Sequence, residues 1–215
     1  TTQLSGVNDG LQSAFEHLRE KGLGNGLGQL RERAFARFAE VGFPTTELES
    51  WRFTNINQIA GRRFTTAPKV VDMEQSSLTG SEIHGVTGAQ IVCVNGHFES
   101  HLCRLDGIPP EVELCSLLDF VRTEPALAKS HLARLADFED PSHAFTALNT
   151  GLMQDGVVVP IPDNTNVEIP VQVQFVSTGG DDLMNHPRLL VVVGDNSQVR
   201  LIESYAGLSN GAYLT

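Results

Sequence analysis

The sequence predicts a mainly β protein with an α-helical N-terminal region, in which the strands form the start of a parallel β-helix. Two observations support this: strand-like apolar runs dominate after residue 150, and they recur at a fixed spacing. Val157–Ile161 leads into Asp163 and Asn164, as Leu189–Val193 leads into Asp195 and Asn196. The two copies lie in a register of 32 residues, from position 163 to position 195. A repeat of this size is typical of stacked-strand architectures.

Parallel coils suit these strands better than propeller blades, which run to about 40–50 residues and carry aromatic or Trp-Asp signatures that the sequence lacks. Pro160, Pro162 and Pro170 fall only in the first copy. Since proline cannot donate to a strand ladder, we expect the first copy to be a terminal, partly unpaired rung. Residues 167–175 alternate between apolar and polar side chains, which predicts a half-buried strand.

The chain divides by pattern into an N-terminal helical region with a β-hairpin, residues 1–150, and the strand region, residues 151–215. Leu11, Phe15 and Leu18 recur at helical spacing and predict a short helix over residues 9–21. Four glycines within Gly22–Gly28 predict a flexible joint.

A second helix follows this joint. Leu27, Leu30, Ala34, Phe38 and Val41 form its apolar stripe, and the charged residues from Arg31 to Glu40 are expected on its other faces. Gly42 and Pro44 should end it sharply.

Two further helical segments are predicted before residue 150. Residues 111–136 are typical of a helical hairpin, with Thr123 as an N-cap and Pro125 in the first turn of its second helix. Asp140–Pro141 should open another short helix that ends at Gly151. His131 and His143 lie in these helices without a second ligand or an acid partner at a recognisable spacing, which favours surface or capping roles.

The single tryptophan, Trp51, lies beside Phe53 in a polar stretch. It could form a platform on which a ligand stacks, or an anchor that packs the helical region onto the next module. Large aromatic side chains mostly serve packing, which favours the anchor.

The clearest local signal is Asn95–Gly96 between two strand-like runs, which predicts a hairpin with a type I′ turn. This hairpin carries the one metal-like cluster of the sequence, Cys93, His97, His101 and Cys103. In the predicted register Cys93 faces Phe98 and therefore points away from the other three. His97 and His101 lie about 13 Å apart along a strand, too far to share one ion. The geometry favours Cys93 as a small buried hydrophobe over a metal ligand.

Composition excludes several classes of function. The 215 residues carry 15 basic and 26 acidic side chains, a net charge of −11, and we find no basic cluster. Nucleic acid and anionic membrane surfaces repel such a chain. No apolar run approaches the roughly 20 residues that span a bilayer, and no signal peptide is recognisable. Three cysteines at spacings of 10 and 12 fit neither a disulfide framework nor a CxxC-type site, which favours a cytoplasmic protein.

Several motifs, taken together and in order, resemble those of the SufB/SufD family. They cover the chain from about residue 29 and look most like the N-terminal half of SufD. The motifs are Gly42-Phe43-Pro44, Glu49-Ser50-Trp51-Arg52-Phe53-Thr54, Val92-Cys93-Val94-Asn95-Gly96-His97-Phe98, Leu148–Gly156, Ile161-Pro162-Asp163-Asn164 and Gly194-Asp195-Asn196-Ser197-Gln198.

The resemblance implies a scaffold subunit of a SufBCD-type complex that assembles iron–sulfur clusters and transfers them to other proteins. It implies a right-handed parallel β-helix core, a SufB-like paralogue and a SufC-like ABC ATPase as partners, and no enzymatic activity. No catalytic, cofactor-binding or metal-binding residue carries over to this chain. An iron–sulfur cluster is expected only in the full complex, and the partner-binding segments are expected beyond Thr215, where the chain looks truncated.

Two alternatives stay open. One is a carbohydrate-active β-helix enzyme, a lyase or a glycosidase, in which Asp163 and Asp195 would form the required carboxylate pair. Corner aspartates are far more often turn formers, which disfavours this reading. The other is a pure interaction module without metal chemistry. The sequence has no P-loop, GxSxG or HExxH motif.

Overall fold

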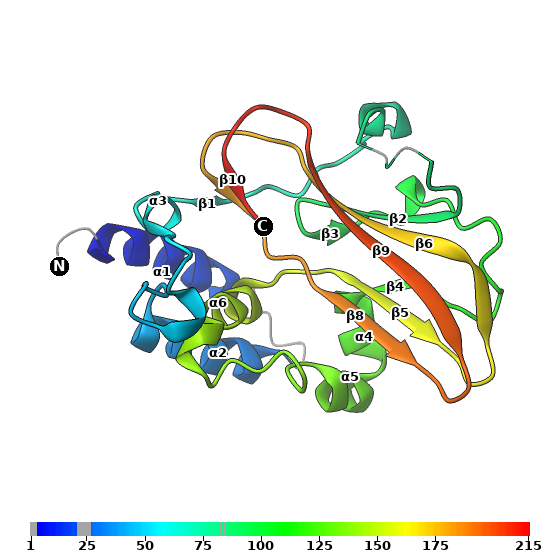
Figure 1. Cartoon of the computed structure of the whole chain (residues 1–215), viewed down its shortest axis with the longest axis horizontal. Coiled ribbons are helices and arrows are strands. Elements are labelled where there is room, and N and C mark those ends of the chain that lie inside the picture. The colour runs from blue at the N-terminus through cyan, green and yellow to red at the C-terminus, as the bar shows by residue number, and fades with distance from the viewer. Residues whose placement is uncertain (1–3, 21–26, 82, 84) are drawn as a thin grey trace.

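The computed structural model describes residues 4–20, 27–81, 83 and 85–215, and within them the fold is mixed α/β (Figure 1). Most of the predicted glycine joint, residues 21–26, lies outside the described residues. The described α-helices are α1 (Leu4–Glu20), α2 (Gly28–Val41), α3 (Asn57–Ala60), α4 (Leu117–Thr123), α5 (Pro125–His131) and α6 (Ala144–Leu152).

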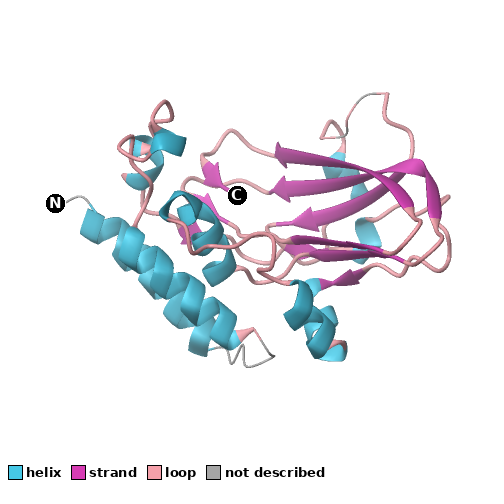
Figure 2. Ribbon diagram, turned by 60° about the horizontal axis from the view of Figure 1, so that its bottom comes forward, coloured by secondary structure: helices cyan, strands magenta, loops and turns pink. Residues whose placement is uncertain are grey.

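The strands form three small sheets, which Figure 2 shows as layers beside the helices. Their orders are β1-β7-β10, β3-β2-β6-β9 and β4-β5-β8. The β2–β3 and β4–β5 pairs are antiparallel, and the other ladders are parallel. The strands are β1 (Thr65–Thr66), β2 (Ala89–Val94), β3 (His97–Phe98), β4 (Cys115–Ser116), β5 (Val157–Ile161), β6 (Asn166–Ser177), β7 (Leu183–Met184), β8 (Leu189–Val193), β9 (Gln198–Gly207) and β10 (Tyr213–Leu214).

The prediction of a mainly β chain that begins a parallel β-helix is wrong. Six helices and three small sheets, two of them mixed, make up the described residues, which contain no closed or solenoid sheet. The two copies of the 32-residue repeat pair with each other in parallel, with Val157 opposite Leu189 and Asn166 opposite Gln198. Beyond a register shift, however, Pro170 pairs with Arg200, so the spacing is not constant along the copy. The repeat therefore reflects two ladders, β5–β8 and β6–β9. Each ladder belongs to a sheet that also contains a strand from earlier in the chain.

The prolines do not mark a terminal rung. β5 lies between β4 and β8, and β6 lies between β2 and β9, so the first copy is interior in both sheets. Pro170 sits where the β6–β9 register shifts, and the β2–β6 ladder begins only at the next residue, Val171. On the β2 side Pro170 therefore lies outside the paired residues, a position that tolerates its missing N–H.

The half-buried strand predicted over residues 167–175 keeps its alternation at Val167 and Glu168, but from Val171 onward it is buried on both faces. Leu78, Val92, Val94, Leu102 and Val176 form a hydrophobic cluster on the second face. Gln174 is completely buried there, and its Nε2 donates to Ser81 O at 2.7 Å. The loop that covers this face is remote in sequence, so the local alternation could not reveal it.

The predicted helices α1, α2 and α6 are confirmed, and they gather at one end of the strands (Figure 1). α2 ends at Gly42, whose φ of 68° suits glycine. The helical hairpin is shorter than predicted, because β4 occupies its start. Ser116 caps α4 by accepting from Asp119 N, while Thr123 ends that helix, so the Thr123 N-cap is wrong.

All three sheets contain strands from both sides of residue 150. A division into units at that residue stays a prediction. None of the helices in the described part of the chain is long and apolar enough to cross a membrane.

Candidate functional site

The segment Leu148–Gly156 joins α6 to β5 at the place where the helices meet the sheets. Two of its glycines bring backbones together. A Cβ on Gly151 would lie 2.9 Å from Phe35 Cβ on α2, and a Cβ on Gly156 would lie 2.0 Å from Arg188 O. Larger side chains would push α2 and the start of β8 away from this segment.

Two arginines meet the C-terminal end of α6. Arg31 is only 3% exposed, and its Nε donates to Met153 O at 3.0 Å. Arg188 Nη2 donates to Thr150 Oγ1 at 2.7 Å. Neither forms an ion pair with a carboxylate among the described residues. Burial lowers the pKa of Arg31 to about 10 and also lowers the pKa of Arg188. The partial negative charge at a helix C-terminus favours cations at this position.

Asp155 ties this segment to the hairpin and to α4. Its carboxylate is 4% exposed and accepts from Phe98 N at 3.3 Å and from Leu118 N at 3.2 Å. His97 Nδ1 lies 3.9 Å from the same carboxylate. Asp155 thus satisfies backbone donors from two separate elements, which is a structural use of a buried acid.

The hairpin is confirmed, with Cys93 opposite Phe98 and Val94 opposite His97. Asn95 and Gly96 have φ values of 48° and 82°, as a type I′ turn requires. Cys93 is completely buried in a hydrophobic cluster with Val173 and Phe175, which confirms its assignment as a small hydrophobe.

The other members of the metal-like cluster have separate contacts. Cys103 Sγ donates to Glu99 O at 3.4 Å, while His101 Nε2 lies 3.1 Å from Met73 O at the surface. Burial is the largest of the causes that raise the pKa of Cys93, and burial also raises the pKa of Cys103 to about 11. Metals bind the thiolate form. In the described part of the chain, no group of three or more His, Cys, Asp or Glu side chains is arranged to hold a metal ion.

Asp163 and Asp195, at the corners of the two copies, do stack as the sequence predicts, and their contacts are those of a turn. Asp163 Oδ1 accepts from Asp195 N at 2.7 Å, and Asn196 Nδ2 donates to Asn164 Oδ1 at 3.0 Å. Asn164 and Asn196 have φ values of 57° and 55°. Asp163 therefore organises the next corner, a role typical of turn aspartates.

Trp51 is the anchor that the sequence predicts. Its Nε1 donates to Ser142 O at 2.9 Å, and its ring lies 5.5 Å from the Phe145 ring. These contacts fix the loop after α2 to the start of α6.

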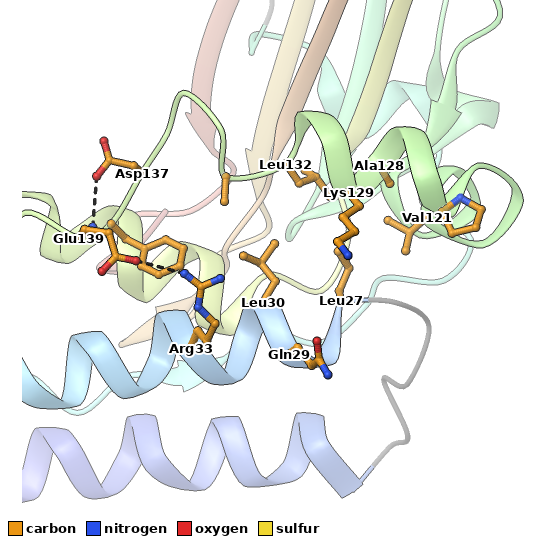
Figure 3. A pocket seen from close by; sticks show the side chains of 13 residues that line it. Leu27, Gln29, Leu30, Arg33, Val121, Ala128, Lys129, Leu132, Asp137 and Glu139 are labelled. Atoms are coloured by element: carbon orange, nitrogen blue, oxygen red, sulfur yellow. Dashed lines mark hydrogen bonds and ion pairs between the residues drawn. The ribbon is translucent and has the colours of Figure 1, made fainter.

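A cavity of about 390 Å³ lies between α2 and α5 (Figure 3). Leu27, Leu30 and Leu132 contribute to its apolar wall. At its rim Arg33 Nη2 pairs with Glu139 Oε1 at 3.2 Å. The described residues of the wall include no Ser, Thr, Cys or His side chain, so they offer apolar contact rather than a nucleophile with an adjacent base.

Sequence reasoning missed the two cations at the end of α6, of which Arg31 is buried and Arg188 is partly buried. It assigned Arg31 to an outer face of the second helix, because the apolar stripe alone explains that helix. Arg188 and His186 fall in a short polar link before β8, and nothing in their local pattern signals burial.

Comparison with known proteins agrees with the motifs. The family model described as "SufBD protein N-terminal region" matches residues 10–173. An iron–sulfur cluster assembly SufBD family protein of Synechocystis sp. is 26% identical over 93% of this chain and 44% of its own length. A SufBD family protein of Arabidopsis thaliana is 30% identical over 46% of this chain and 21% of its own length.

The iron–sulfur cluster assembly protein SufD of Bacillus subtilis is 38% identical over 32% of this chain and 15% of its own length. The chain thus spans less than half the length of these curated relatives. The family match covers the helices from residue 10 on, the hairpin, the segment Leu148–Gly156 and the first copy of the repeat. On this match the chain belongs to the SufBD family.

Proposed function

We propose that this protein is a scaffold subunit in iron–sulfur cluster assembly, working in a SufBCD-type complex and without enzymatic activity of its own. The observation that carries the proposal is the family match over residues 10–173. It is supported by relatives whose names refer to iron–sulfur cluster assembly.

The contacts of the polar side chains favour a scaffold over a catalyst. Asp155 accepts two backbone N–H groups, and Asp163 accepts the N–H of the next corner. Thr150 Oγ1 accepts a hydrogen bond from the guanidinium of Arg188. These side chains form hydrogen bonds that stabilise the fold, whereas a glycosidase needs two carboxylates that are free to face a substrate.

The partners of the whole protein follow from this proposal. We expect a SufB-like paralogue and a SufC-like ABC ATPase, and we expect the assembly in the cytoplasm. The cluster itself would be the cargo of the complex. In this proposal the chain described here contributes no metal ligand.

Affinity purification of the tagged full-length protein from a native lysate tests the proposal. Mass spectrometry should recover an ABC ATPase and a second SufBD family protein in comparable amounts. Recovery of neither partner would count against the scaffold, and recovery of other proteins instead would favour a pure interaction module.

The metal content of residues 1–215 tests the assignment of the cluster to the complex. Expressed alone and purified without oxygen, this chain should contain no stoichiometric iron. A brown protein with equimolar iron and acid-labile sulfide would contradict that part of the proposal.

A further inference from the structure

The connection from β1 to β2 lies over the second face of the β2–β6 pair and is held there by one buried side chain. Its residues 68–81, which we call the strap, contain a single helical turn, Gln75–Leu78, and no strand. Leu78 is 1% exposed and packs in the hydrophobic cluster on that face. It is the one buried residue of the strap, in which Val70, Met73 and Ser81 are half-buried and the rest are exposed. Connections longer than about 12–15 residues with so little regular structure are uncommon and often gate or bind.

Few polar contacts fasten the strap. Among the described residues, no backbone–backbone hydrogen bond joins it to the rest of the chain. Three of its carbonyl oxygens contact side chains of the body instead: Pro68 O and Asn95 Nδ2 at 2.9 Å, Met73 O and His101 Nε2 at 3.1 Å, and Ser81 O and Gln174 Nε2 at 2.7 Å. The conformational entropy of a whole segment opposes these contacts and the burial of Leu78.

The closed strap also leaves two buried acceptors unpaired. Gln90 and Glu99 are 2% and 9% exposed, and the Oε1 atom of each has no hydrogen-bond partner. Gln90 Nε2 donates to Gln174, the side chain that holds Ser81. Lys69 Nζ of the strap lies 4.0 Å from Glu99 Oε1. Both acceptors therefore lie beside the strap, and water that reached them on opening would remove an unfavourable feature of the closed state.

The strands beneath the strap have their own support. β2 pairs with β6 at six successive positions, from Ala89 opposite Val171 to Val94 opposite Val176. Their opposite face packs in a separate cluster that includes Ile91 and Val173. Neither the ladder nor this cluster contains a residue of the strap, so both can persist when the strap lifts.

We propose that the strap opens as a unit, by release of Leu78, while the sheets stay folded. Closed, it makes the second face of β2 and β6 part of the core. Open, it exposes an apolar strip on that face, formed by Val92, Val94 and Val176. The strap is thus a conformational device that controls access to this strip. This inference does not depend on the proposed function.

Hydrogen–deuterium exchange of the full-length protein tests the proposal, under conditions in which exchange follows the opening equilibrium. The amides of Ser77, Thr79 and Ser81 donate within the strap and report its closure. The amides of Val171–Ser177 report the sheet. At low urea concentrations, exchange of the strap amides should stay nearly constant, because opening exposes little surface, whereas exchange of the sheet amides should accelerate.

Equal acceleration of both segments by urea would overturn the proposal, because it would show that the strap opens only when the whole protein unfolds. Strap amides that exchange as fast as those of an unfolded chain would overturn it too, because no closed strap would then exist. Both outcomes are read from the parent protein and need no variant.

Two variants separate strap opening from global unfolding. Leu78→Ala should speed exchange of the strap amides at least tenfold, because the closed strap loses its apolar contact. Val159→Ala is the matched control, since Val159 belongs to the cluster on the opposite face and stays buried when the strap opens. It should speed exchange of the sheet amides by about 30- to 150-fold and leave the strap amides unchanged. Equal effects of Val159→Ala on both segments, or no effect of Leu78→Ala on the strap, would refute the proposal.

Discussion

The two copies of the strand–corner–strand pattern are alike in sequence and unlike in burial. β5 and the second half of β6 are almost completely buried, whereas β8 and β9 are half-buried or exposed along their length. The paired rings of Phe175 and Tyr205 stack 5.0 Å apart, yet they are 4% and 59% exposed. Position between neighbouring strands, and not the residue pattern, sets how much each copy contributes to stability.

The reason lies in what flanks each copy. β6 has β2 on one side and β9 on the other, and β5 has β4 and β8. β8 and β9 each end a sheet, so one row of their backbone groups has no strand partner among the described residues. Within residues 1–215, the same Val- and Leu-rich sequence thus forms an interior strand in one copy and the last strand of a sheet in the other.

The largest effect is expected where the two copies approach most closely. Gly156→Ala would place a Cβ 2.0 Å from Arg188 O, and backbone on both sides would have to move. We expect a loss of more than about 3 kcal/mol in the free energy of unfolding, measured by urea denaturation. Gly10→Ala in α1 is the control, since a Cβ there meets only Phe64 O at 3.5 Å. A Gly156→Ala protein as stable as this control would contradict the close approach.

His186, which lies shortly before the second copy, should make the stability of the protein depend on pH. The pKa of His186 is about 4 in the folded protein, against an ordinary value of 6.5, because of burial first and Arg188 second. Between these values the unfolded chain binds more protons, so stability is full above pH 6.5 and falls as pH drops toward 4. The loss should reach at most about 3 kcal/mol.

Chemical denaturation measures this dependence, and the neutral His186→Gln variant supplies the comparison. The variant should lose stability less steeply over the same pH range. Identical slopes in both proteins would show that His186 does not cause the loss.

A matched pair of valines compares the copies directly. Val159 is buried in β5, and its ladder partner in β8, Val191, is half-buried. Val159→Ala should cost about 2–3 kcal/mol, because it removes two buried carbons and leaves a cavity. Val191→Ala should cost less than about 1 kcal/mol. Equal losses in equilibrium unfolding would mean that the edge strand is as firmly packed as the interior one.

The corners should show the smallest effect. Asn164→Ala forces alanine to a φ of 57° and removes the Asn196 Nδ2 bond, so we expect a cost of about 1 kcal/mol. Asn164→Gly loses the bond but accepts the backbone angle. It should therefore lie between the parent and Asn164→Ala in thermal unfolding. An alanine variant more stable than the glycine variant would exclude backbone strain as the cause.

Features that rest on local backbone chemistry could be predicted from the sequence. The Asn95–Gly96 turn, the end of α2 at Gly42 and the corner role of Asp163 all depend on a few consecutive residues. The family could be recognised too, because its motifs keep their order.

Features that rest on distant segments could not be predicted. Gln174 looks like a solvent-facing strand residue until the loop carrying Ser81 covers it. The fold class failed for the same reason, since β2, β3 and β4 come from the helical part of the chain and complete the sheets. The burial of Arg31 and the partial burial of Arg188 depend on the position of α6, which no local pattern specifies.

Hydrogen–deuterium exchange resolved to single amides tests the difference between the two copies most directly. In residues 1–215, the amides of Val171–Ser177 in β6 should exchange only through global unfolding. Those amides of β9 that point away from β6 should exchange orders of magnitude faster. Equal protection along both strands would contradict the conclusion that position, and not pattern, sets the stability of each copy.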